Sequence, residues 1–347
     1  MVSVRGVARA AVVAAMLLAA GAVQAITIDM VTVGDPGNVG ELSGSVAGGY
    51  GPGRICGAVA YTYNIGKYEV TASQYTGFLN EVGGIDTYGL YKADLSGSGI
   101  TRSGGGTLAN PYRYMVASNF VNRPVNLLSW GDAARFANWL NNGQPTGAQG
   151  LATTEDGTYY LNGAMTSNAL MAVTRKPGWK WAITSEDEWY KAAYYKGGGT
   201  NAGYWDYPTS SNTAPGRDMA DASGNNANYY TGSGAYPIDS GNYTTVVGEF
   251  QNSPSPYGTY DQGGNVYEWT EAIIGNDRGL RGGMYDSTGI YLLASDRNNN
   301  GPIHDSYGFR VVQVPEPAPI PEPVSLVSGA IGLACVGAYL RRRRRMR

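Results

Sequence analysis

Three short segments in the middle of the chain carry helix-start signals, and long stretches rich in glycine, asparagine, serine and tyrosine separate them. In the first segment, Thr71 can cap a helix together with Gln74, and apolar residues then recur with helical spacing as far as Val82. The second helix is expected to start at Ser129 and to stop near Gly143. These signals predict short helices joined by long irregular connections.

The third helix has the clearest start signal. Ser185 and Glu188 have the spacing of a capping box, and Gly197 marks the expected end of the helix. Glu186 and Asp187 add two more carboxylates to the first turn. Such a cluster could serve as acid/base machinery, but acids in a first turn are far more often electrostatic caps, and we interpret them as caps.

The remaining patterns indicate strands and loops. Residues 59–63 and 307–312 are apolar or alternating in the manner of strands, and residues 143–177 predict a long loop or a hairpin insertion. The chain also has 51 glycines and 27 tyrosines against 5 phenylalanines, which suits many backbone corners better than a helical bundle. We therefore expect an irregular, loop-rich α+β fold.

The first 25 residues have the layout of a secretory signal peptide. Arg5 and Arg9 precede an apolar stretch at residues 10–22, and a small-residue pattern ends at Ala25. A retained N-terminal membrane anchor is the alternative, which the short apolar stretch and the well-formed cleavage site disfavour. We expect signal peptidase to cleave after Ala25 and the protein to be exported.

The tail, residues 315–347, has three parts in order. Two Pro-Glu-Pro triplets are followed by a predominantly apolar segment of 17 residues, 324–340, and then by five consecutive arginines. As a helix the apolar segment spans about 26 Å, slightly less than a hydrocarbon core of about 30 Å, so it is expected to cross a membrane with the arginines in the cytoplasm. A nucleic-acid role for the arginines is disfavoured by the adjacent apolar helix.

This order of parts resembles the PEP-CTERM sorting signal of Gram-negative-type bacteria. The resemblance implies recognition by an exosortase and removal of the tail, so that the mature protein ends near Pro323. The tail would then act as a transient inner-membrane anchor before delivery to the cell surface or an extracellular matrix.

The charge balance of the body, residues 26–314, differs from that of the ends. Eight of the 25 basic residues and two of the 27 acidic residues lie in the terminal segments, which leaves the body with a net charge of −8. An acidic body disfavours a nucleic-acid partner and suits cation binding. Cys56 and Cys335 are the two cysteines of the chain, and we expect Cys56 to be a small buried hydrophobe rather than a reactive thiol.

Several segments in chain order carry a family resemblance that spans nearly the whole body. They are Ile-Gly-Lys-Tyr-Glu-Val-Thr at 65–71, Arg-Pro-Val at 123–125 with Ser-Trp at 129–130, Ser-Glu-Asp-Glu-Trp at 185–189, Tyr-Gly-Thr-Tyr-Asp at 257–261, Gly-Asn-Val-Tyr-Glu-Trp-Thr at 264–270, Arg-Gly-Gly at 281–283 and Gly-Phe-Arg-Val at 308–311. The series resembles the formylglycine-generating enzyme family, also called the sulfatase-modifying factor family. The resemblance implies one compact domain, related to the C-type lectin fold and stabilised by bound calcium.

The chain departs from the family enzymes at the copper site. In those enzymes the Gly-Gly motif is followed by two cysteines, five residues apart, and the matching positions here are Ser287 and Leu292. Serine and leucine cannot supply soft thiolate ligands, so we expect no copper. Related enzymes bind iron through histidines, but His304 is the single histidine of this chain, so we expect no iron and place His304 in a surface loop.

The resemblance implies two calcium sites. Asp261 and Glu268, with the backbone oxygens of Gly264 and Val266, match the first family site, whereas a plain turn with Glu268 in a salt bridge is the alternative. The second site would use the residues Asn228, Tyr229, Asp239 and Gly241. The family pattern also implies buried ion pairs for Arg281 and Arg310.

Two functions therefore compete. The first is a non-catalytic, calcium-stabilised surface module that binds a glycan, a peptide or the extracellular matrix, with tyrosine and tryptophan faces suited to sugars. The second is a divergent enzyme of the formylglycine-generating family that uses other residues near the Gly-Gly motif, such as Asp286, Arg297 or Arg310. The missing cysteine pair favours the first.

Overall fold

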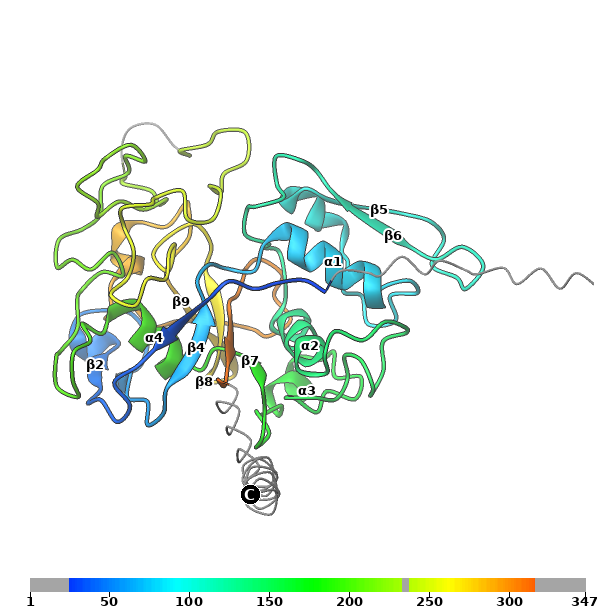
Figure 1. Ribbon diagram of the computed structural model, residues 1–347, viewed down its shortest axis with the longest axis horizontal. Helices are drawn as coiled ribbons and strands as arrows, with labels where there is room; N and C mark the ends of the chain where they lie inside the picture. The colour runs from blue at the N-terminus through cyan, green and yellow to red at the C-terminus, as the bar shows by residue number, and fades with distance from the viewer. Residues whose placement is uncertain (1–24, 233–236, 316–347) are drawn as a thin grey trace, which may run out of the picture.

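A four-stranded antiparallel sheet lies at the centre of the molecule (Figure 1). The computed structural model describes residues 25–232 and 237–315. The sheet has the order β1-β4-β11-β7, with strands β1 (Met30–Val33), β4 (Tyr63–Gly66), β11 (Val311–Gln313) and β7 (Trp181–Ile183). Val312 pairs with Ile65 on one side and with Ala182 on the other, so the last strand of the body lies between two strands from earlier parts of the chain.

A second sheet and two hairpins complete the strands of the described chain. The second sheet has the order β10-β9-β8, with strands β8 (Glu268–Ile274), β9 (Asp277–Arg281) and β10 (Asn298–Asn300). The two hairpins are β2 (Glu41–Ser43) with β3 (Arg54–Cys56), and β5 (Ile100–Ser103) with β6 (Arg113–Val116). Figure 1 shows the second hairpin projecting from the body beyond the helices.

All three predicted helices are present. They are α1 (Ala72–Val82), α2 (Trp130–Asn141) and α4 (Glu186–Tyr194), and each begins with a capping box. The helix α4 ends earlier than expected, because Tyr195 is extended and forms a bridge with Tyr204. The other helical segments are short: α3 (Ser167–Met171), η1 (Ser45–Ala47), η2 (Ala93–Ser98) and η3 (Gly289–Leu292).

The strand predictions were correct in part. Residues 59–62 are irregular and the strand β4 begins only at Tyr63, so the predicted strand 59–63 was placed too early. At the other end, Tyr307 and Gly308 form isolated bridges and only Val311–Gln313 is a strand. Residues 143–177 are mostly irregular, as expected, with the short helix α3 and one bridge between Tyr159 and Arg175.

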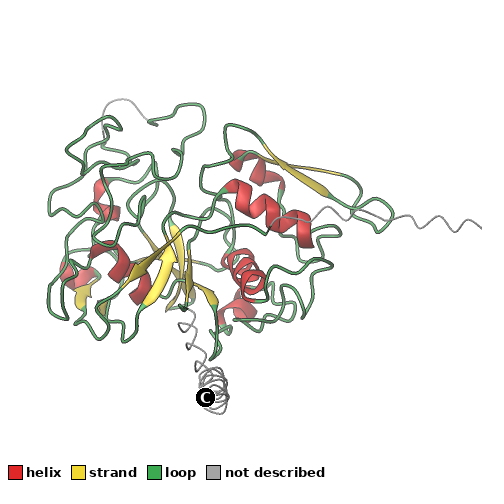
Figure 2. Cartoon of the chain, viewed as in Figure 1, coloured by secondary structure: helices red, strands yellow, loops and turns green. Residues whose placement is uncertain are grey.

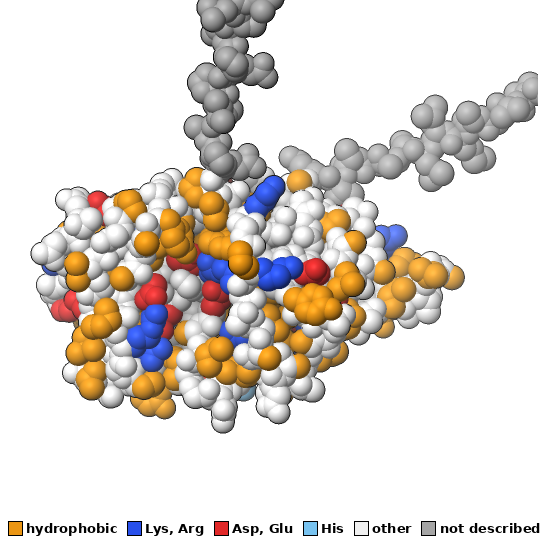
Figure 3. All heavy atoms as spheres, turned by 90° about the horizontal axis from the view of Figure 1, so that it is seen from below, with side chains coloured by type: hydrophobic (Ala, Val, Ile, Leu, Met, Phe, Trp, Pro, Cys, Tyr) orange, Lys and Arg blue, Asp and Glu red, His pale blue; other side chains and the backbone are white. Residues whose placement is uncertain are grey.

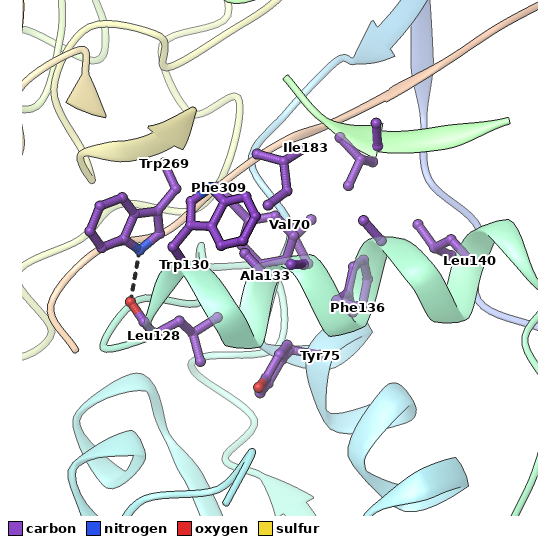
Figure 4. Packing of buried hydrophobic residues seen from close by; sticks show 14 of the residues in the cluster. Val70, Tyr75, Leu128, Trp130, Ala133, Phe136, Leu140, Ile183, Trp269 and Phe309 are labelled. Atoms are coloured by element: carbon purple, nitrogen blue, oxygen red, sulfur yellow. Dashed lines mark hydrogen bonds between the residues drawn. The ribbon is translucent and has the colours of Figure 1, made fainter. Parts of the chain in front are cut away.

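The hydrophobic core lies between the sheets and the helices α1 and α2. Phe136 on α2 meets Phe309 edge to face at 5.3 Å between ring centroids, and both side chains are fully buried (Figure 4). Trp269 points into the same cluster and donates its indole N–H to the carbonyl oxygen of Leu128 at 2.9 Å (Figure 4). Trp130 donates in the same way to the carbonyl oxygen of Thr270. The tryptophans therefore tie α2 to β8 while filling the core.

Loops make up most of the fold, as Figure 2 shows, and the short helices and strands between them confirm the α+β prediction. The signal peptide, apart from Ala25, and the apolar tail segment lie outside the described residues. Among the residues that are described, no helix is long and apolar enough to cross a membrane.

Candidate functional site

The turn between Thr259 and Tyr267 brings together the residues of the first expected calcium site. Asp261, Gly264 and Asn265 all have positive φ, at 59°, 85° and 58°. A Cβ atom at Gly264 would lie 2.2 Å from the carbonyl oxygen of Asn228, so only glycine fits this close approach. The amide N–H of Asn265 donates to that same carbonyl oxygen at 2.8 Å. The turn is therefore fixed against residue 228, a member of the second expected site.

Glu268 leaves this turn at the start of β8 and forms a buried ion pair with Arg310. Both side chains are almost completely buried, and the two carboxylate oxygens each accept a hydrogen bond of 2.7 Å from the guanidinium. Trp189 donates a third hydrogen bond to the carboxylate at 2.8 Å. Arg310 also donates to the carbonyl oxygens of Gly66 and Tyr260, both at 2.9 Å. The geometry at Glu268 thus matches the salt-bridge alternative, and it confirms a buried ion pair for Arg310.

Glu69 is a third carboxylate of this cluster, and the expected ligands did not include it. Its side chain is 1% exposed; one oxygen accepts a hydrogen bond from the Asn265 amide at 3.2 Å, and the other has no hydrogen-bond partner in the described chain. Glu69 stands between Tyr68 and Val70 just after β4. Its position in the Tyr-Glu-Val-Thr motif gave no separate indication of burial beside Asp261.

The cluster holds more acidic than basic groups, with three carboxyls and one guanidinium among the described residues. Burial raises the pKa of Asp261 to about 6, and burial together with the Asp261 charge raises the pKa of Glu69 well above its ordinary value. Arg310 lowers the pKa of both carboxyls, but it already pairs with Glu268. Three carboxyls thus lie around one guanidinium, and one of their buried oxygens has no hydrogen-bond partner among the described residues, which leaves this oxygen available to a further partner.

Two observations limit this fit. Both oxygens of Glu268 already accept hydrogen bonds, and one oxygen of Asp261 accepts the amide N–H of Gly248 at 2.5 Å. Within the described ranges, no three acidic, thiol or imidazole side chains converge closely enough to hold a metal ion between them. A cation at this turn would therefore need backbone and amide oxygens as well, which is the ligand mixture that calcium accepts.

The second expected site is assembled in part. The side-chain amide of Asn228 donates to the carbonyl oxygen of Tyr243 and to the side-chain oxygen of Asn265, while its own oxygen, Oδ1, is buried with no hydrogen-bond partner among the described residues. Asp239 pairs instead with Arg123 at 2.5 Å and accepts the amide N–H of Gly241. The free oxygen of Asn228 is thus the feature here that suits a cation.

Tyr229, the remaining residue of that set, faces away from it. Its hydroxyl donates to the carbonyl oxygen of Pro215, and its ring packs in a small apolar cluster with Ala227 and Leu292. Its hydroxyl is therefore engaged elsewhere, which leaves its backbone oxygen as the possible ligand. Leu292 in this cluster is one of the two positions that the family resemblance aligns with the copper cysteines.

Both positions that correspond to the copper cysteines are closed by packing. Leu292 is fully buried, and the space beside it is so small that a Cβ atom on Gly283 would lie 2.8 Å from its side chain. Ser287 is 8% exposed, and its hydroxyl accepts the amide N–H of Met284 at 3.1 Å. The backbone of Ser287 also accepts the amide N–H of Tyr230. Leucine here fills the core, and serine closes a turn.

The three residues proposed for a divergent enzyme have different structural roles. Arg310 is fully engaged in the buried cluster, and Arg297 makes a buried pair with Glu186, with nitrogen–oxygen distances of 2.8 and 3.0 Å. Asp286 is exposed, and the partial desolvation of its carboxyl raises its pKa. His304 lies exposed in a loop, as expected, and stacks on Tyr307 with ring centroids 5.4 Å apart.

The first-turn carboxylates of α4 do more than cap the helix. Glu188 completes the capping box and also forms a double hydrogen bond with Arg175, and Asp187 pairs with Arg54. Glu186 forms ion pairs with Arg281 and Arg297. Burial raises the pKa of the Glu186 carboxyl, but the two guanidinium groups have the larger effect and hold that pKa below its usual range. The interpretation of these acids as caps was therefore incomplete, because they are also buried ion-pair centres.

Arg281 fixes the strand that leads into the Gly-Gly motif. Besides its pair with Glu186, it donates to the backbone carbonyls of Ala294 and Asp296. This confirms a buried ion pair for Arg281. Cys56 is fully buried as expected, with its sulfur 3.3 Å from an Arg281 nitrogen.

On the molecular surface shown in Figure 3, basic and acidic side chains lie side by side across the middle rather than in separate patches.

Two curated proteins are similar to this chain, one over most of its length and the other over a short segment. The serine/threonine-protein kinase pkn1 of Chlamydia pneumoniae is 25% identical over 295 residues, which cover 78% of this chain and 36% of that protein. The protein of the same name from Chlamydia caviae is 37% identical over 78 residues, covering 16% of this chain and 13% of its own length. The chain thus spans about a third of the length of the first relative.

Three solved structures match most of the chain with low sequence identity. CarF is 22% identical with a TM-score of 0.48, covering 83% of this chain and 98% of its own. Treponema denticola variable protein 1 is 21% identical with a TM-score of 0.49, covering 84% and 97%. PvdO from Pseudomonas aeruginosa is 21% identical with a TM-score of 0.43, covering 83% and 92%.

The family model for the sulfatase-modifying factor enzyme 1-like domain matches residues 57–315. That range includes the turn at Asp261, the buried Glu268–Arg310 pair and the closed positions Ser287 and Leu292. The chain therefore belongs to the sulfatase-modifying factor (FGE-sulfatase) domain family.

Proposed function

We propose that this protein is an exported, calcium-stabilised binding or structural module that has lost the copper chemistry of the family enzymes. The observation that carries the proposal is the burial of Leu292 at one copper-ligand position and the turn-closing role of Ser287 at the other. Copper that activates oxygen needs soft ligands and an open coordination position, and neither side chain supplies a soft ligand.

Calcium would be held at two neighbouring places. Asp261 and Glu268, with the backbone oxygens of Gly264 and Val266, would hold one ion, and the unpaired oxygen of Glu69 supports this choice. At the second place, the ligands would be the side chains of Asn228 and Asp239 with the backbone oxygens of Tyr229 and Gly241. Bound calcium would offset the excess negative charge of the buried carboxyls and so stabilise the fold.

The proposed ligand is a surface glycan, a peptide or the extracellular matrix, and no nucleic acid is proposed. Tyr50, Tyr160 and Tyr243 are among the exposed aromatic side chains, and the ring of Tyr243 lies 5.5 Å from that of Tyr285. Exposed tyrosines offer an apolar face with a polar edge, which is what sugar rings and peptides contact. The net charge of −8 in the body disfavours a polyanion.

Export and sorting are part of the proposal. Signal peptidase would remove residues 1–25, and an exosortase would remove the tail near Pro323 after a transient stay in the inner membrane. The intact mass of the protein recovered from the cell surface tests both steps. A mass that retained either terminal segment would contradict the corresponding step.

The loss of copper chemistry can be tested with a matched variant. The mature protein and its double variant Ser287→Cys/Leu292→Cys are each incubated with copper and with a peptide that contains the substrate cysteine of a sulfatase. The peptide is then analysed by mass spectrometry. We expect no formylglycine from the wild type. Formylglycine from the wild-type protein would establish the competing function, a divergent oxidoreductase. Copper binding by the double variant alone would support the assignment of the two positions.

A further inference from the structure

The first residues after the expected signal-peptide cleavage point are held by a specific side chain. The backbone N–H of Ile26 donates to the side-chain oxygen of Gln144 at 2.8 Å, and the side-chain amide of Gln144 donates back to the carbonyl oxygen of Ile26 at 2.9 Å. Gln144 itself has positive φ, at 60°, just after α2. The Gln144 side chain thus forms hydrogen bonds with both the N–H and the carbonyl group of residue 26.

Neighbouring contacts fix the same segment. The side chain of Ile26 packs onto the core beside Gly77 of α1, where a Cβ atom would lie 2.8 Å from it. Gln74 donates its side-chain amide to the carbonyl oxygen of Thr27 at 2.8 Å. The chain then runs into β1 at Met30. Residues 26 and 27 are therefore positioned by α1 and the end of α2, rather than trailing from the sheet.

A cavity of about 260 Å³ lies at this point. It is lined by Ala25, Ile26, Gln144 and Trp139, and by Glu81 on the last turn of α1. Glu81 is the one charged group among the described residues that line the cavity. Burial raises the pKa of Glu81, which is what a carboxylate without a nearby cation shows. The wall of the cavity thus offers an amide oxygen and an unbalanced carboxylate.

We propose that this cavity is the binding site for the mature N-terminus, in which the α-ammonium of Ile26 is held by Gln144 and faces Glu81. The inference rests on the export processing proposed above. Water adds across the Ala25–Ile26 peptide bond under a signal peptidase, leaving a carboxylate on the released peptide and a free amine on Ile26, which takes a proton from solvent. The new ammonium keeps its hydrogen bond to Gln144 and gains two more donors and a charge, which Glu81 complements.

This site would make processing contribute to folding. Before cleavage, the peptide N–H of Ile26 supplies one neutral hydrogen bond and Glu81 stays without a partner charge. After cleavage, a charge-assisted interaction forms between the first residue of the mature chain and the helix α1. The processed protein is therefore expected to be more stable than the same chain with residues left in front of Ile26.

The test compares two full-length chains exported by a Gram-negative bacterial host. One is the wild type, and the other carries Gly-Ser inserted between residues 25 and 26, so that its new ammonium lies two residues before Ile26 and no longer at the nitrogen that contacts Gln144. Mass spectrometry first establishes the N-terminal residue of each mature protein. A wild-type N-terminus other than Ile26 would overturn the inference, and it would do so without bearing on calcium or copper.

Melting temperature and amine reactivity then test the binding site itself. We expect the insertion to lower the melting temperature, and Glu81→Gln to lower it in the wild type but not in the insertion chain. We also expect an amine-selective reagent at pH 7 to modify Ile26 about tenfold more slowly than the inserted glycine, as for a pKa raised by one unit. Equal effects of Glu81→Gln in both chains, or equal reactivity of the two amines, would contradict the site.

Discussion

Replacing Arg310 by methionine removes the guanidinium that, among the described residues, lies beside the buried carboxyls at the Asp261 turn. The substitution breaks two hydrogen bonds of 2.7 Å to Glu268 and leaves the carbonyl oxygens of Gly66 and Tyr260 without their donor. Removing one partner of a buried ion pair typically costs about 3–5 kcal/mol. Because Glu69 and Asp261 remain nearby, we expect the loss at pH 7 to lie at the upper end of that range.

The matched control is Glu268→Gln, which removes a negative charge from the same pair. Arg310 then still faces Glu69 and Asp261, so the charge of the cluster is better balanced and we expect at most about half of the loss. Urea unfolding with linear extrapolation, in the presence of a chelator, gives both free energies of unfolding. Calcium should restore part of the stability of Arg310→Met. An equal or larger loss for Glu268→Gln would refute the excess of negative charge.

Three further predictions concern packing, backbone geometry and pH. Leu292→Ala should lower the free energy of unfolding by about 2–5 kcal/mol, measured by urea unfolding, since it opens a cavity at a fully buried position; a loss below about 1 kcal/mol would mean that the position is not closed. Gly264→Ala should lower the melting temperature more than Gly143→Ala, because both glycines have positive φ but a Cβ at Gly264 would also meet the Asn228 carbonyl at 2.2 Å, whereas nothing lies within 4 Å of one at Gly143; equal shifts would contradict the close approach. Burial raises the pKa of Asp296 to about 7, although Arg281 lowers it. The protonated carboxyl therefore favours the folded state, and this contribution to the free energy of unfolding is complete below about pH 4. As the pH rises to about 7, up to about 4 kcal/mol of it is lost. In Asp296→Asn the free energy of unfolding should fall less steeply between pH 4 and pH 7, and an unchanged slope would contradict the shift.

The helices could be predicted from sequence because their start signals are local. Thr71, Ser129 and Ser185 each accept a hydrogen bond from an amide three residues ahead, so the evidence for each helix lies within one turn. The central strands are three or four residues long, and β11 pairs with β4 from the other end of the domain. Pairing over such a distance leaves no local pattern, which is why the first strand was placed too early.

The candidate site was predictable only where the family motif names the residue. Asp261 and Glu268 were named, but Glu69 joins them through tertiary packing that no spacing reveals. The carboxylates of α4 show the same limit, because the capping box predicts the hydrogen bond of Glu188 to Ser185 and says nothing of Arg175. Partners that come from distant segments could be found only in three dimensions.

The calcium dependence of the melting temperature of the purified protein, measured with its metal content, tests the central claim most directly. A ligand at 100 times its dissociation constant adds about 2.7 kcal/mol, which for a domain of this size raises the melting temperature by about 5 °C. We therefore expect calcium to raise the melting temperature by several degrees over a chelator, with calcium bound and copper absent. The same melting temperature in calcium and in chelator, or stoichiometric copper, would contradict the account.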